Sequence, residues 1–132
     1  MAARILVVED NPPNRALMEY LLRAFGHQVL TATDGRAGVE RAVAEHPDLI
    51  LMDLQLPVLT GFEALRSIRK VRALDNVPVI AVTAQAMVGD SEKAHRHGFD
   101  GYITKPIVPE TFVTEIEAFL PVAMRSGRPP SS

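Results

Sequence analysis

The run Leu49–Asp53 constrains the fold of this 132-residue chain more than any other stretch. Its four large apolar residues, which lie between Pro47 and Pro57, are too few for an ordinary helix. They are typical of a strand that is buried on both faces, as at the centre of a parallel sheet. The run ends on Asp53, and a carboxylate beside a buried strand is costly unless a cation or hydrogen-bond donors meet it.

Two interpretations of Asp53 fit this run taken alone. A single Asp in such a place more often caps the turn that follows the strand. In an open α/β sheet, however, ligands bind beyond the carboxyl ends of the strands, and Asp53 lies at such an end. The ends of three other predicted strands favour a functional role.

Short apolar runs alternate with segments of helical periodicity along the chain. The predicted strands are Ile5–Val8, Val29–Leu30, Leu49–Asp53, Val77–Val82 and Gly101–Thr104. The apolar positions of the predicted helices lie within Leu17–Phe25, Val39–Val43, Phe62–Ile68, Met87–Ala94 and Phe112–Leu120. This order predicts an α/β fold, a (βα)5 doubly wound five-stranded parallel sheet with helices on both faces. The expected topology is flavodoxin-like, with strand order 2-1-3-4-5 and a site above the first and third strands.

Two segments are expected to be less firmly packed than the rest. The fourth helix, predicted over residues 86–97, has a thin apolar stripe of Met87, Val88 and Ala94, so we expect it to shift at small cost. Residues 1–121 form one predicted domain. The Gly, Pro, Ser and Arg content of residues 122–132 predicts a disordered tail.

Several polar residues away from the strand ends are expected to be solvated. His27 and His46 lie near the ends of elements. Arg66, Arg69 and Arg72 form a row on the outer face of the third helix, for which a docking role is the alternative.

The composition excludes several classes of function. The net charge is −2, which gives no reason to expect binding to nucleic acid or to an anionic membrane. The chain has no cysteine, so disulfides and thiolate metal sites are excluded. It shows no signal-peptide pattern and no apolar run near the roughly 20 residues that span a bilayer. A cytoplasmic location is therefore predicted.

Four predicted strands end in polar, reactive side chains, and these ends open on one edge of a parallel sheet. They carry Glu9 and Asp10, Asp53, Thr83 and Lys105. Three crowded carboxylates raise one another's pKa unless a cation lies among them. Oxygen ligands without His or Cys favour Mg²⁺. Lys105 adds a point charge and Thr83 a hydroxyl donor, so the set predicts a phosphoryl pocket with a carboxylate nucleophile.

These motifs resemble those of the receiver domain of two-component response regulators, from about Arg4 to Pro121. The matching motifs are Val8–Asn11, Met52–Pro57 with Gly61, Val82–Ala84 and Lys105-Pro106. Within that family the chain is most similar to short single-domain regulators of the DivK type and to receivers of hybrid histidine kinases.

The resemblance implies a phospho-acceptor and a metal site. Asp53 would accept a phosphoryl group from a phosphohistidine on a histidine kinase or a histidine phosphotransfer protein. Asp10 and Asp53 would bind Mg²⁺ directly, together with the backbone carbonyl of Gln55, and Glu9 would act through water.

The resemblance also implies a switch. Thr83 and Lys105 would bind phosphoryl oxygens, Tyr102 would turn inward on activation, and the bond before Pro106 would be cis. Gln55 and Gln85 would flank the path of the attacking water. The output surface would comprise the fourth helix, the fifth strand and the fifth helix, read by a downstream protein target. The chain would then be a switch and not an enzyme, with no direct DNA binding, and a monomer or weak dimer.

Two other functions fit these motifs less well than the switch does. A Mg²⁺-dependent phosphohydrolase with an Asp nucleophile usually has a second acid where this chain has Gln55, and no cap insertion is present here. A flavodoxin-like nucleotide binder needs a Gly- or Ser/Thr-rich phosphate loop, whereas Glu9 and Asp10 repel phosphate without a metal. The sequence leaves open whether the chain is a complete regulator or a receiver cut from a hybrid histidine kinase or larger regulator.

Overall fold

A five-stranded parallel sheet in the order β2-β1-β3-β4-β5 organises the protein. The structure is a computed structural model that describes residues 3–84 and 89–125. The strands are β1 Arg4–Val8, β2 Gln28–Ala32, β3 Leu49–Asp53, β4 Val79–Thr83 and β5 Gly101–Thr104. The helices are α1 Pro12–Ala24, α2 Gly35–Glu45, α3 Gly61–Arg69, α4 Asp90–Arg96 and α5 Pro109–Glu117, with short 3-10 turns η1 Arg72–Leu74 and η2 Val122–Met124. The predicted α/β fold and strand order are confirmed. Across the described ranges, every helix is too short or too polar to cross a membrane.

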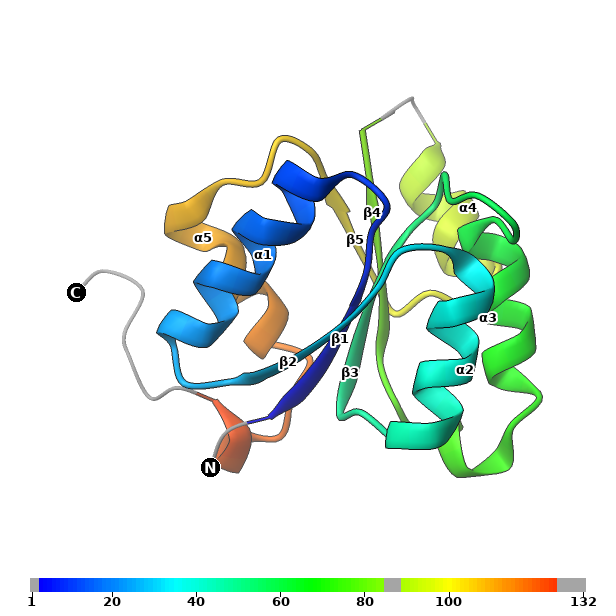
Figure 1. Cartoon of the computed structure of the whole chain (residues 1–132), viewed down its shortest axis with the longest axis horizontal. Helices are drawn as coiled ribbons and strands as arrows, with labels where there is room; N and C mark the ends of the chain where they lie inside the picture. The colour runs from blue at the N-terminus through cyan, green and yellow to red at the C-terminus, as the bar shows by residue number, and fades with distance from the viewer. Residues whose placement is uncertain (1–2, 85–88, 126–132) are drawn as a thin grey trace.

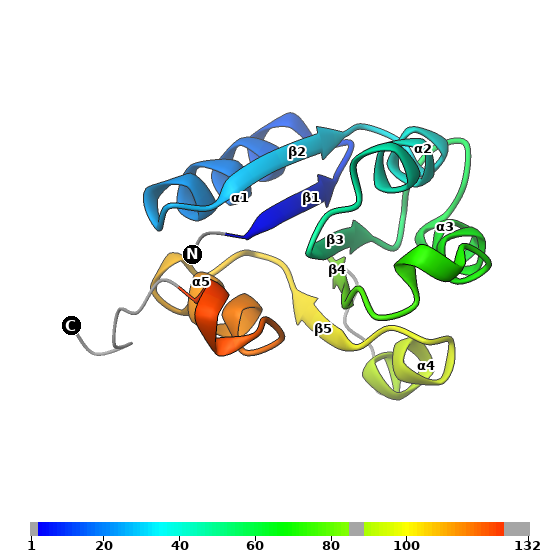
Figure 2. The same cartoon turned by 90° about the horizontal axis from the view of Figure 1, so that it is seen from below.

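The sheet separates two apolar cores. Helices α1 and α5 cover one face, and α2, α3 and α4 cover the other (Figures 1 and 2). Strand β3 lies between them with Leu49 and Leu51 in the core under α1 and α5, and Ile50 and Met52 in the opposite core. All four side chains are buried, which explains why the run is apolar at every position instead of every second one.

Two glycines allow helices to approach the strand ends closely. A Cβ added to Gly38, inside α2, would lie 2.8 Å from a Val8 methyl carbon on β1. A Cβ added to Gly61, at the start of α3, would overlap the carbonyl oxygen of Asp53. The Gly61 N–H also donates to the Leu54 carbonyl at 3.0 Å. Gly61 thus allows α3 to begin directly against the backbone at the end of β3.

The two segments predicted to be weakly packed lie only partly within the described residues. Helix α4 is described from Asp90, and Met87 and Val88, which carried the predicted stripe, lie outside the described residues. Of the predicted tail, the structure describes residues 122–125, which contain the η2 turn, and Met124 packs against the core. Arg125 donates to the Leu120 carbonyl at 3.2 Å, which satisfies a carbonyl beyond the end of α5. Residues 126–132 lie outside the described part.

His27 is buried, contrary to the prediction that it is solvated. Its Nδ1 accepts a hydrogen bond from the Ala3 N–H at 3.1 Å. The ring proton is therefore on Nε2, which donates to Glu117 Oε2 at 2.6 Å. The imidazole ties the start of the sheet to the end of α5.

Arg69 is likewise a structural residue and not part of a solvated row. Its guanidinium donates to the carbonyls of Leu74 and Val77 at 3.1 and 3.0 Å and pairs with Asp100 at 2.9 Å. Asp100 also accepts from the Val79 N–H at 2.8 Å. One cation thereby joins the end of α3 to the turn between α4 and β5.

Candidate functional site

The candidate site is a cavity of about 430 Å³ at the carboxyl ends of β1 and β3. It is lined by the predicted residues Glu9, Asp10, Asp53, Gln55 and Lys105, and also by Asn14 and Ala84. The parallel register explains this gathering, because Val8 of β1 pairs with Met52 of β3 and their next residues are acidic. The predicted acidic residues therefore meet at the switch point between β1 and β3, where ligands bind in sheets of this topology.

Asp53 meets hydrogen-bond donors at both carboxylate oxygens. Oδ1 accepts from the Gln55 N–H at 3.0 Å, and Oδ2 accepts from the Lys105 ammonium at 3.0 Å. The residue is buried, with 5% of its surface exposed. These donors offset the cost of placing a carboxylate at the end of a buried strand.

Lys105 bridges two of the acidic residues. Its Nζ lies 2.6 Å from Glu9 Oε1 and 3.0 Å from Asp53 Oδ2. Its backbone N–H donates to the Thr83 carbonyl at 2.8 Å, which fixes the residue beside the end of β4. Burial alone lowers the pKa of Lys105, but the hydrogen bonds and charges of Glu9 and Asp53 outweigh it and raise the pKa above its usual 10.5. Lys105 is therefore a fixed positive charge in this pocket.

Glu9 is the acidic residue whose ionisation is most disturbed. It is fully buried, and burial raises its pKa from 4.5 to about 7, with a further contribution from the Asp53 carboxylate. Lys105 and the Asn11 N–H, which donates to Glu9 Oε2 at 3.1 Å, counteract part of this rise. Near neutral pH Glu9 is thus divided between its charged and neutral forms when no metal is bound.

The acidic residues fit a hard divalent cation. One carboxylate oxygen from each of Glu9, Asp10 and Asp53 lies within 4.8 Å of the other two. Asp10 is exposed, so the cluster opens to solvent on its side. Carboxylate oxygens with room for water are the ligands that Mg²⁺ prefers. Gln55 lines the same cavity, so its predicted contribution through the backbone carbonyl is compatible with its position.

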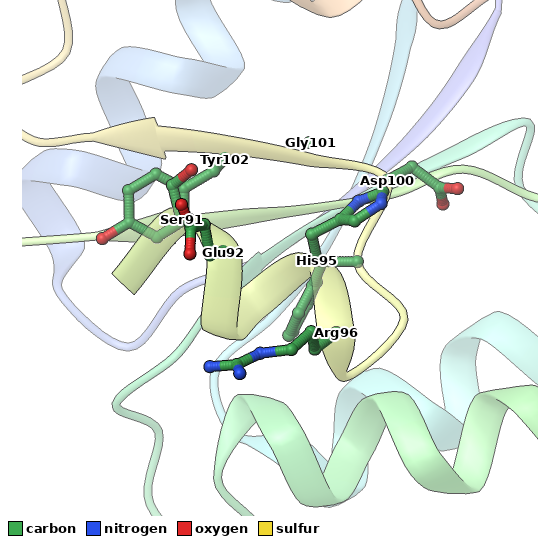
Figure 3. A pocket seen from close by; sticks show the side chains of 8 residues that line it. Ser91, Glu92, His95, Arg96, Asp100, Gly101 and Tyr102 are labelled. Carbon is green, nitrogen blue, oxygen red and sulfur yellow. The ribbon is translucent and has the colours of Figure 1, made fainter. Parts of the chain in front are cut away.

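The two predicted switch residues lie on β4 and β5, the strands that follow β3 in the sheet. Thr83 is buried at the end of β4. Tyr102 lies on β5 with its hydroxyl oxygen shielded from solvent, and it lines a second cavity, of about 560 Å³, between α4 and β5. Figure 3 shows Tyr102 beside Ser91 and Glu92 at the start of α4. The peptide bond between Lys105 and Pro106 is cis, and Gln85 lies outside the described residues.

Two polar residues of α1 near the cavity were missed by sequence reasoning. Asn14 lines the cavity, and Arg15 Nη1 donates to the Glu9 carbonyl at 3.0 Å. The signal that indicates them is helical spacing, since Asn11 caps α1 and residues three and four positions later return to the same side.

Comparison with known proteins identifies relatives along almost the whole chain. The family model of the response regulator receiver domain matches residues 5–117. The polar-differentiation response regulator DivK of Brucella ovis is 39% identical over 120 residues, which are 91% of this chain and 98% of the relative. DivK of Brucella anthropi is 38% identical over the same share of each chain.

Solved structures agree with these relatives. The receiver domain of the sensor histidine kinase PA1611 from Pseudomonas aeruginosa PAO1 has a TM-score of 0.82 and 38% identity, covers 90% of this chain and 98% of its own, and holds a magnesium ion in its active-site cleft. The chemotaxis response regulator CheY4 of Vibrio cholerae has a TM-score of 0.85 and 28% identity, and covers 91% of this chain and 100% of its own. This chain belongs to the response regulator receiver domain family.

Proposed function

We propose that the chain is a phospho-acceptor switch of a two-component system, and that Asp53 receives the phosphoryl group from a phosphohistidine. The donor would be a histidine kinase or a histidine phosphotransfer protein. The observation that supports this proposal is the surroundings of Asp53. A lysine ammonium lies 3.0 Å from one of its oxygens, and two further carboxylates lie within reach of a shared cation.

The proposed reaction is a direct transfer between two side chains. An Asp53 carboxylate oxygen forms a bond to phosphorus while the bond from phosphorus to the donor imidazole breaks, and the electron pair of that bond stays on the imidazole nitrogen. Lys105 leaves the carboxylate oxygen that it now contacts and binds a phosphoryl oxygen, and the Thr83 hydroxyl donates to another. Asp10 and Asp53 would hold Mg²⁺ directly and Glu9 would hold it through water, and the metal would neutralise the charge that develops on these oxygens.

The proposed output is a changed surface and not a reaction on a further substrate. Helix α4 is short, its N-cap residue Gly89 provides no side-chain cap, and it lines one cavity together with Tyr102 (Figure 3). A helix held by few contacts can be repositioned at small cost, so phosphorylation would shift its population between two positions. We propose that a downstream protein reads α4, β5 and α5. The cytoplasmic location and the monomeric or weakly dimeric state stay predictions.

Phosphorylation of Asp53 can be tested by mass spectrometry. Treatment with acetyl phosphate and Mg²⁺ is expected to add one phosphoryl group to the intact protein, and Asp53→Asn is expected to remove this addition. Asp75→Asn is the matched control, because Asp75 is exposed and lies outside the cavity. Equal labelling of the Asp53→Asn protein would overturn the assignment.

A further inference from the structure

Arg15 lies in the first turn of α1, beside the acidic end of β1. Its guanidinium Nη1 donates to the backbone carbonyl of Glu9 at 3.0 Å, in a partly buried contact. Its own N–H donates to the Asn11 carbonyl at 2.9 Å, which anchors the residue in the helix. The side chain therefore reaches back from α1 to the strand that carries the acidic residues.

The Glu9 carbonyl belongs to the peptide group that joins Glu9 to Asp10. A peptide group is planar, so a hydrogen bond that fixes its oxygen also fixes the directions in which the two residues leave it. Glu9 is held at other points, since its N–H donates to the Ala32 carbonyl at 3.0 Å and its carboxylate contacts Lys105. Asp10 is exposed, and the orientation of its side chain depends on this backbone.

We propose that Arg15 is a positioning residue of the metal site. By its hydrogen bond to the Glu9 carbonyl, Arg15 directs the Asp10 carboxylate toward Asp53. With the backbone held in this way, oxygens of the three carboxylates lie within 4.8 Å of one another. Groups one step behind metal ligands orient them, and their loss weakens metal binding by roughly 10–100-fold. The inference rests on the proposed function only for its consequence in phosphoryl transfer.

The sign of the effect separates positioning from simple electrostatics. Arg15 carries a positive charge near a cation site, so its removal should strengthen Mg²⁺ binding if charge alone matters. If Arg15 positions Asp10, its removal should weaken Mg²⁺ binding. Charge effects also shrink as the Debye length falls from about 10 Å at 0.1 M salt to about 3 Å at 1 M, whereas loss of positioning persists.

The test compares Arg15→Met with Arg23→Met in the full chain. Both variants remove one positive charge from α1. Arg15 contacts the Glu9 carbonyl, whereas Arg23 pairs with Glu19 at 2.9 Å. Calorimetric titration with Mg²⁺ is expected to show binding roughly tenfold weaker for Arg15→Met and near native for Arg23→Met. In the metal-free protein, the NMR amide signals of Asp10 and Asn11 are expected to move in the Arg15 variant only.

Arg15→Lys keeps the charge and one donor, so it is expected to recover part of the lost affinity. If Arg15→Met does not fold, the comparison of Arg15→Lys with the native protein decides, with a few-fold loss expected. Native or tighter Mg²⁺ binding by the folded variant overturns the proposal. Because this affinity is measured without a phosphoryl donor, failure of Asp53 to accept phosphate is a separate result.

Discussion

Val58 holds a backbone conformation that valine rarely adopts. Its φ is +72°, and the residue is 65% exposed in the loop between β3 and α3. In the left-handed region the Cβ crowds the following carbonyl at a cost of roughly 1–2 kcal/mol, and Asn tolerates that region better than a β-branched residue does. This strained residue follows Asp53 in the loop between β3 and α3, and Gln55 of the same loop lines the cavity.

We expect Val58→Asn to raise the free energy of unfolding by about 1 kcal/mol, since relief of strain costs little packing at an exposed position. Urea denaturation measures the change. Val43→Asn is the control, because Val43 is also partly exposed but lies within α2, where Asn brings no such relief. A loss of stability in the Val58 variant would show that the loop depends on the valine side chain.

At the scale of single residues, the sequence predicts the members of the site but not how they are held. Glu9, Asp10, Asp53 and Lys105 follow from one rule, because parallel strands present their carboxyl ends on one edge. The contact of Arg15 with the Glu9 carbonyl does not follow from that rule. It depends on the direction of a long side chain in three dimensions, and periodicity gives only the face of the helix.

Helix α5 is tied to the rest of the protein by a buried pair of ionisable residues. His27 is 4% and Glu117 is 7% exposed, and the Nε2 and Oε2 atoms lie 2.6 Å apart. Removal of the imidazole takes a buried hydrogen bond from the Glu117 carboxylate, and a hydrogen bond to a charged group contributes roughly 1.5–3 kcal/mol. We therefore expect His27→Ala to lower the free energy of unfolding by about 3 kcal/mol, beyond what loss of apolar contact explains.

A double-mutant cycle isolates this pair. Denaturation of His27→Ala, Glu117→Ala and the double variant should give a coupling free energy well above that of an exposed pair, which is about 0.2–1 kcal/mol. Arg23 and Glu19, both on α1 and at the surface, supply the exposed comparison. Additive losses for His27 and Glu117 would mean that the contact contributes nothing of its own.

The helices and strands are largely predictable from the sequence, whereas the side-chain contacts between them are not. Alternating apolar runs give five strands and five helices because each must bury a face. Gly38 is a poor helix former inside α2, but its lack of a side chain allows the helix to pack closely on Val8. The burial of His27 could not be foreseen, since its partner lies 90 residues away along the chain.

For the whole molecule, the acidic pocket links folding, pH and metal binding. The pKa of Glu9 is about 7 in the folded protein against 4.5 for an ordinary Glu, so the folded state binds more protons between these pH values. The contribution of Glu9 to stability is therefore fully present below pH 4.5 and is lost as pH rises through about 7. The size of this loss is on the order of 3 kcal/mol. The raised pKa of Lys105 acts only above 10.5, outside this window.

Mg²⁺ should reverse this trend, because a cation binds the ionised carboxylates and competes with the proton. Without metal, we expect the stability of the native protein relative to that of Glu9→Gln to fall between pH 4.5 and 7, since the amide cannot ionise. Saturating Mg²⁺ should raise the stability of the native protein. This increase over the metal-free protein should be larger at pH 8 than at pH 5. Thermal unfolding across pH, with and without Mg²⁺, measures both curves. If the stability of the native and Glu9→Gln proteins changes with pH in the same way without metal, the pKa of Glu9 is not raised by its burial.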